Sequence, residues 1–149
     1  MADKRRFELF ADLVAAEFPG VRSAYDIAGG QGKLNEALTV RGLDVTTFDT
    51  RWKRAPVRYA ERRFTLDEPC ACGLLVGMHP DGATRVIVEY AQKHRVPFAI
   101  VPCCADNGMP YKPWMRHLAE LATAGGIEVV ERLLPMQGRA RVLVGRPRG

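Results

Sequence analysis

Two hydrophobic periodicities alternate along the chain and predict alternating helices and strands. In residues 6–18 the apolar side chains recur every three or four positions, which predicts a helix, and Pro19 and Gly20 follow it as stop signals. The apolar face of this helix is formed by Phe7, Phe10, Leu13, Val14 and Phe18. The same spacing predicts further helices over about residues 32–41, 82–94 and 112–124.

Short apolar runs between these helices predict strands. Residues 73–78 and 97–104 are apolar almost throughout, which favours strands covered on both faces, as in a parallel sheet. Residues 126–146 indicate two strands joined by a short turn at 136–138, so the last strand is expected to run antiparallel to its neighbour. Further strands are predicted at about residues 23–28, 44–48 and 58–65.

This order of elements predicts one α/β domain over residues 1–149, with an N-terminal helix at about 6–18 and a core at about 22–146. Six or seven strands, with helices between all but the last two, indicate a doubly wound, mostly parallel sheet with helices on both faces and a C-terminal antiparallel hairpin. A ligand of such a sheet lies beyond the carboxyl ends of its central strands. One rim is therefore expected to hold the loops that follow Ala28, Asp49, Met78 and Cys104.

The composition is compatible with this fold and bears on the location and the partners of the protein. The chain is 47% hydrophobic and 26% charged, as in ordinary globular domains. No apolar run approaches the roughly 18 residues of a membrane span, and the first residues lack the apolar middle of a signal peptide, so a cytoplasmic location is expected. The net charge of +5 suits either a nucleic-acid partner or a solvated basic surface. The cysteines lack C-x-x-C spacing, which favours buried thiols and no metal site: Cys70, Cys72, Cys103 and Cys104.

A glycine cluster after the first predicted strand indicates a nucleoside-binding unit. Residues 29–32 read Gly-Gly-Gln-Gly, which lets the backbone turn tightly and lets a ligand approach it closely. Asp49 ends the next strand, where a carboxylate can accept hydrogen bonds from both hydroxyls of a ribose. A dinucleotide fingerprint would need glycine at the position of Asn35, so an NAD-dependent oxidoreductase is a weaker alternative.

The segment Asp26-Ile27-Ala28-Gly29-Gly30-Gln31-Gly32 resembles the first motif, D/E-x-G-x-G-x-G, of the class I (Rossmann-like, seven-stranded) S-adenosylmethionine-dependent methyltransferases. Ala28 stands where that motif has its first glycine. The resemblance extends over essentially the whole chain, because the seven-stranded core of this family also ends in an antiparallel hairpin. It implies S-adenosylmethionine as the cofactor.

The resemblance also implies a role for each matching residue. The loop 28–32 would lie against the methionine portion with Asp26 beneath it, and Asp49 would hold the ribose hydroxyls. Asp67 would face the adenine amine, although it can equally be an ordinary loop residue. The full set of cofactor-binding residues implied in this way is Asp26, Ala28, Gly29, Gly30, Gly32, Asp49, Thr50, Arg51, Leu66, Asp67 and Met78.

The segment after the fourth strand shows a more distant resemblance. Residues 77–84, Gly-Met-His-Pro-Asp-Gly-Ala-Thr, are similar to the G-K-H-L-C-G-x-A-T-D segment of tRNA 2′-O-methyltransferases, which also carry a Cys-Cys pair at the end of the next strand, as this chain does at residues 103–104. Pro80, Asp81 and Arg85 depart from that pattern. The resemblance implies RNA as a possible methyl acceptor and partner.

Two residues of this segment are the candidate acid–base catalysts. His79 and Asp81 are expected to project from the ligand-binding rim, where they could remove the proton of an acceptor hydroxyl. Each also has a structural interpretation, because Asp81 in Pro-Asp-Gly can cap the next helix and His79 can bond a backbone carbonyl.

Aromatic residues interleaved with cations suggest an acceptor-binding surface. Trp52, Tyr111, Lys112 and Trp114 could stack on bases and meet phosphates, or the rings could anchor loops to the core. The sequence thus predicts a methyltransferase with RNA as the favoured acceptor. A non-catalytic methyltransferase-like module that binds RNA or protein is the alternative.

Overall fold

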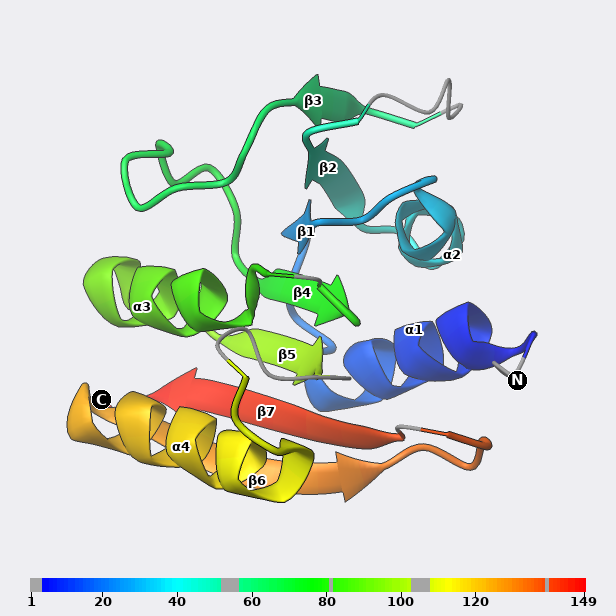
Figure 1. Cartoon of the computed structure of the whole chain (residues 1–149). Coiled ribbons are helices and arrows are strands. Elements are labelled where there is room, and N and C mark those ends of the chain that lie inside the picture. Colours follow the sequence, from blue (N-terminus) through cyan, green and yellow to red (C-terminus); the bar gives the residue numbers. More distant parts are fainter. Residues whose placement is uncertain (1–3, 52–56, 81, 103–107, 139) are drawn as a thin grey trace.

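The computed structural model describes residues 4–51, 57–80, 82–102, 108–138 and 140–149. These residues form four helices and seven strands in the expected alternating order (Figure 1). The helices are α1 (Arg6–Glu17), α2 (Lys33–Val40), α3 (Thr84–His94) and α4 (Tyr111–Ala124). The strands are β1 (Ser23–Ile27), β2 (Asp44–Asp49), β3 (Tyr59–Glu61), β4 (Leu75–Met78), β5 (Phe98–Val101), β6 (Ile127–Leu133) and β7 (Arg141–Pro147).

The strands form one sheet in the order β3-β2-β1-β4-β5-β7-β6. Strand β7 is antiparallel to both of its neighbours, and the other pairings are parallel. The predicted doubly wound, mostly parallel seven-stranded sheet with its C-terminal antiparallel hairpin is therefore confirmed. The chain winds outward in opposite directions from β1 and β4, which makes the crevice beyond their carboxyl ends the topological switch point.

Two apolar layers, one on each face of the sheet, hold the helices. Helices α1 and α2 pack on one face and α3 and α4 on the other, as Figure 1 shows. Side chains of a strand alternate between the two layers: Val76 of β4 joins the layer of α1 and α2, and Leu75 joins the layer of α3 and α4. Burial on both faces explains why the central strands are apolar almost throughout.

Several boundaries differ from the sequence prediction. The third strand is limited to β3, and residues 134–140 make a longer connection than the predicted three-residue turn, closed by the Leu134 N–H on the Ala140 carbonyl at 2.9 Å. The expectation of buried thiols is wrong for Cys70, which is exposed, while Cys72 is half-buried. The other two cysteines, at residues 103 and 104, lie outside the described residues. Within the described ranges, no helix is both long and apolar enough to span a membrane.

Candidate active site

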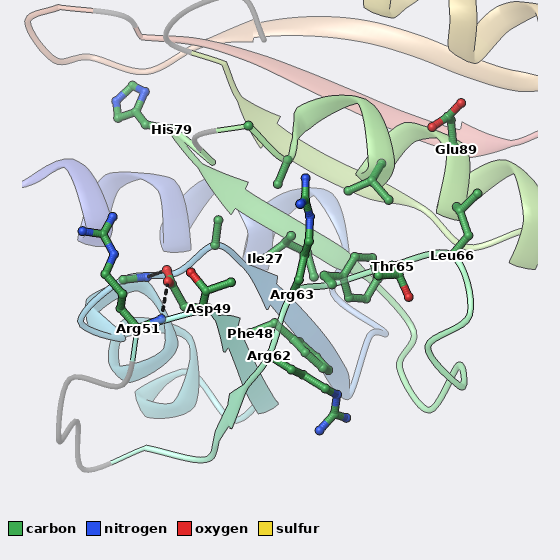
Figure 2. Close-up of a pocket in the computed structure, with 17 residues that line it drawn as sticks. Ile27, Phe48, Asp49, Arg51, Arg62, Arg63, Thr65, Leu66, His79 and Glu89 are labelled. Atoms are coloured by element: carbon green, nitrogen blue, oxygen red, sulfur yellow. Dashed lines mark hydrogen bonds between the residues drawn. The ribbon is translucent and has the colours of Figure 1, made fainter.

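A pocket of about 630 Å³ lies at the switch point, beyond the carboxyl ends of β1, β2 and β4 (Figure 2). Its lining comes from the loop after β1, residues 49–51 after β2, residues 62–66 after β3 and the segment from His79 into α3. Small-molecule sites commonly have volumes of roughly 300–1,000 Å³. The expectation that loops after separate strands share one rim is confirmed for the loops after β1, β2 and β4.

The glycine loop turns sharply because three of its residues adopt left-handed backbone angles. Ala28, Gly30 and Gly32 have φ values of 54°, 57° and 79°. Alanine tolerates this region less well than glycine, which accounts for glycine being typical at the position of Ala28. Gly29 is required for a different reason, since a Cβ there would clash with Oδ2 of Asp26. The loop is therefore packed directly on the buried carboxyl group of Asp26.

Asp49 faces the glycine loop, as the sequence predicts. Its Oδ2 accepts a hydrogen bond from the Gly30 N–H at 2.9 Å, and its Oδ1 accepts one from the Arg51 N–H at 3.1 Å. The parallel pairing of β1 with β2, which puts Ile27 opposite Phe48, brings the two loops together. Each carboxylate oxygen can accept a second hydrogen bond, so Asp49 retains the capacity to bind two ligand hydroxyls from its place in the pocket wall.

Tyr59 connects the same two loops and was missed by the sequence analysis. Its hydroxyl oxygen lies 3.0 Å from the Gly30 carbonyl and 2.6 Å from the Arg51 carbonyl, so its single proton is shared between them. Burial, assisted by the charge of Asp49, raises the pKa of Tyr59 to about 12, which keeps that proton in place at neutral pH. A tyrosine in a predicted strand carries no signal of this role, because it depends on the short pairing of β3 with β2.

A buried polar network supports the loop from beneath. Oδ2 of Asp26 accepts from the Thr47 hydroxyl at 2.9 Å, and the Asn35 amide donates to the Thr47 oxygen at 3.0 Å and the Val45 carbonyl at 3.2 Å. Burial raises the pKa of Asp26 to about 7, with the Thr47 bond opposing the shift. Asn35, which stands where a dinucleotide fingerprint has glycine, thus has a structural role.

The wall beyond β3 combines aromatic packing with a fixed loop. The rings of Phe48 and Phe64 meet edge to face, with centroids 5.3 Å apart. Helix α3 holds the following residues, because Lys93 donates to the Leu66 carbonyl at 2.9 Å and Tyr90 donates to the Glu68 carbonyl at 2.8 Å. An apolar surface suited to a flat ring is formed by Ile27, Phe48, Phe64, Leu66 and Val86. Residues 62–65 were not predicted as site residues, because a loop after a short strand has no periodicity that indicates its direction.

Most of the predicted cofactor contacts fall around this pocket, in two groups. The pocket is lined directly by Ala28, Gly30, Asp49, Thr50, Arg51 and Leu66. Three further residues do not line the pocket but belong to the glycine loop or support it from beneath: Asp26, Gly29 and Gly32. Asp67 is exposed outside the pocket. Met78 shares the face of Val76 on β4 and packs toward α1 and α2, so side-chain alternation directs it away from the predicted contact.

His79 lies at the edge of the pocket in a left-handed backbone conformation, with φ of 52°. Its N–H donates to the Val101 carbonyl at 2.8 Å. Figure 2 shows its imidazole standing apart from the centre of the pocket. Burial, with the nearby positive charge of Arg6 as a second cause, lowers the pKa of His79, so the ring is neutral at pH 7. Asp81, the second catalytic candidate, lies outside the described residues.

The predicted aromatic acceptor surface does not form as expected. Trp114 is 0% exposed, because it falls with Leu118 and Ala122 on the inward face of α4, and its ring stacks on His117 in the core. A fully buried ring cannot stack on a base, so this assignment is corrected. Tyr111 and Lys112 border a separate hollow of about 310 Å³ between α4 and the β6–β7 hairpin. Trp52 lies outside the described residues.

Comparison with known proteins identifies the fold. No protein-family model matches the chain, and no curated protein gives a significant match. Among solved structures, the chain is similar to the 1,6-didemethyltoxoflavin-N1-methyltransferase of Burkholderia thailandensis, solved with bound 1,6-didemethyltoxoflavin and S-adenosylhomocysteine. The two have a TM-score of 0.68 and 14% identity, over 99% of this chain and 80% of that one.

Two further structures show the same relationship. A sugar N-methyltransferase from a Streptoalloteichus species matches with a TM-score of 0.68 and 13% identity, over 98% of this chain and 88% of that one. Human N-acetylserotonin methyltransferase, in complex with S-adenosylmethionine, matches with a TM-score of 0.63 and 14% identity, over 97% of this chain and 51% of that one. The chain thus spans about half of the human protein and most of the other two. At these identities the comparison establishes the fold alone. The chain has the fold of the S-adenosylmethionine-dependent methyltransferases.

Proposed function

We propose that this protein binds S-adenosylmethionine and transfers its methyl group to an acceptor. The observation that carries the proposal is the juxtaposition of Asp49 with the Gly30 loop across a pocket at the switch point of the sheet. A carboxylate with free acceptor capacity on one side and closely approachable backbone on the other suit a ribose and the chain attached to it. The shared fold of methyltransferases solved with S-adenosylmethionine or S-adenosylhomocysteine supports the same function.

The residues present fit this cofactor. Asp49 would accept from the ribose hydroxyls, and the methionine portion would lie along Ala28 and Gly30. The apolar wall that includes Phe64, Leu66 and Val86 would hold the adenine. When bound there, the cofactor supplies a methyl group on a positively charged sulfur. Because transfer is an in-line displacement, the main task of the protein is to align the acceptor and to receive its proton.

His79 is the candidate for receiving that proton, and its role is a proposal. Its lowered pKa leaves the imidazole neutral at pH 7, the form that can act as a base. In the described part of the chain its buried Nδ1 has no hydrogen-bond partner, so this nitrogen is not committed to holding the fold. Replacement by Gln is expected to lower kcat with little change in cofactor affinity. Equal loss of both would assign His79 to the binding site instead.

The acceptor is tested by offering the protein each class of molecule. RNA is the acceptor proposed from the sequence, and its remaining support is the distant resemblance of residues 77–84 and the net charge of +5, without the contribution of Trp114. The solved neighbours named for toxoflavin precursors and sugars support a small molecule instead. Purified protein is incubated with methyl-labelled S-adenosylmethionine and separated pools of RNA, protein and metabolites. Label in one pool that is lost with Asp49→Ala supports the proposal, and cofactor binding without label in any pool contradicts it.

A further inference from the structure

Among the described charged residues that line the pocket, Arg63 has a guanidinium without a protein partner. Arg62 is held by Glu68 through two hydrogen bonds of 2.9 and 2.8 Å, and Glu89 pairs with Arg85 at 3.5 Å. The carboxylate of Asp49 is engaged by backbone N–H groups. Arg63 also lines the pocket, and within the described ranges it forms no ion pair or hydrogen bond. Its charge is therefore uncompensated by the described protein.

The two neighbouring arginines point in opposite directions. Figure 2 shows Arg62 directed out of the pocket, toward the outer side of Phe48, where its guanidinium lies 5.3 Å from the ring centroid. Arg63 extends instead into the space that the lining residues enclose. The chain bends at Arg62, directly after β3, where the Arg62 N–H donates to the Ala60 carbonyl at 2.9 Å. Arg63 is thus presented to a ligand, while Arg62 is paired with Glu68.

The cofactor does not account for this cation if it binds as proposed. Its only anionic group is the carboxylate of its methionine portion, which would lie by Gly30 in the loop after β1, whereas Arg63 follows β3. The positively charged sulfur of the cofactor adds to the positive potential around the acceptor. A second cation, Arg51, also lines the pocket without a carboxylate partner in the described part of the chain. The unpaired arginines and the positive charge on the sulfur of the cofactor both favour a negatively charged acceptor.

We propose that the methyl acceptor carries an oxyanion group, a carboxylate or a phosphate, and that Arg63 binds this group. A guanidinium presents two parallel N–H donors that match either anion, which makes arginine better suited to this recognition than lysine. This inference rests on the proposed function and narrows its substrate class to acidic acceptors. Arg63 is then a specificity-determining residue, and neutral or cationic acceptors are bound less well.

Calorimetry on protein saturated with S-adenosylhomocysteine tests the inference with simple probes. Benzoate, its neutral counterpart benzamide and inorganic pyrophosphate are titrated separately. We expect an oxyanion probe to bind more tightly than benzamide, to weaken with added salt, and to lose about tenfold or more in affinity in Arg63→Gln. Arg22→Gln is the matched control. Arg22 is exposed at the amino end of β1, so its replacement removes the same charge from a position outside the pocket.

The outcomes separate this inference from the proposed function. Binding of both benzoate and pyrophosphate no tighter than that of benzamide, or unchanged anion affinity in Arg63→Gln, would overturn the inference, even where S-adenosylhomocysteine binds. Failure of S-adenosylhomocysteine to bind, with oxyanion binding at Arg63 intact, would instead count against the proposed function. Arg63→Lys keeps the charge without the paired donors, so an intermediate affinity supports bidentate recognition, and full retention restricts the effect to charge.

Discussion

Removal of the Asp49 carboxylate tests the geometry of the site most specifically. In Asp49→Ala, the N–H groups of Gly30 and Arg51 lose their acceptor, and the ribose hydroxyls lose theirs. Hydrogen bonds to a charged group contribute about 1.5–3 kcal/mol each when measured by deletion. The site is open to solvent on one side, so we expect S-adenosylhomocysteine binding to weaken by about 2–3 kcal/mol, or roughly 30- to 150-fold.

Calorimetric titration of the variant with S-adenosylhomocysteine measures this loss, and thermal unfolding without ligand checks the fold. Asp44→Ala is the matched control, since Asp44 lies on the same strand, pairs with exposed Arg58 and is outside the pocket. Asp49→Asn keeps one acceptor oxygen and should fall between the wild type and the alanine variant. If folded Asp49→Ala binds the ligand as tightly as Asp44→Ala does, the assignment of Asp49 to the ribose is refuted.

Three further changes test the support of the glycine loop. Tyr59→Phe removes the proton shared by two loop carbonyls, so S-adenosylhomocysteine affinity should fall by about 1 kcal/mol with little change in Tm. A large drop in Tm at unchanged affinity would give Tyr59 a purely structural role. Gly29→Ala places a Cβ against Asp26 and should lower Tm by several degrees more than Gly20→Ala, where nothing lies within 4 Å; equal Tm values would contradict the packing. Asp26→Asn tests the raised pKa of about 7. The folded wild type keeps a proton that the unfolded chain releases near its usual pKa of 3.8, so wild-type stability should decline as pH rises from about 4 to 7, and the free energy of unfolding of the variant relative to wild type should increase across that window. Parallel pH profiles in denaturant unfolding would show that the carboxyl of Asp26 is not perturbed.

The sequence predicts the centre of the site well because backbone geometry determines it. Carboxyl ends of neighbouring parallel strands must meet at one edge, so a glycine loop after β1 and a carboxylate after β2 are brought together by strand pairing alone. The approach of Gly30 to Asp49 follows from this pairing. Backbone geometry also determines the turn at Ala28, which adopts the left-handed conformation although it has a side chain.

The periphery of the site depends on information that local sequence does not contain. Tyr59 and Arg63 act through the position of the short strand β3, which is set by pairing with β2 over three residues. Trp114 was assigned from the composition of its segment, although the i, i+4 spacing with Leu118 and Ala122 indicates the buried face of a helix. Met78 was assigned from its place at the end of a strand, but alternation turns its side chain to the opposite layer.

A crystal structure of the protein with S-adenosylhomocysteine is the most direct test of the central claim. We predict that both ribose hydroxyls lie within hydrogen-bonding distance of the Asp49 carboxylate and that the homocysteine portion lies along the backbone at Gly30. A ligand found elsewhere on the molecule, a ribose turned away from Asp49, or a folded protein that takes up no ligand at millimolar concentration would contradict the account.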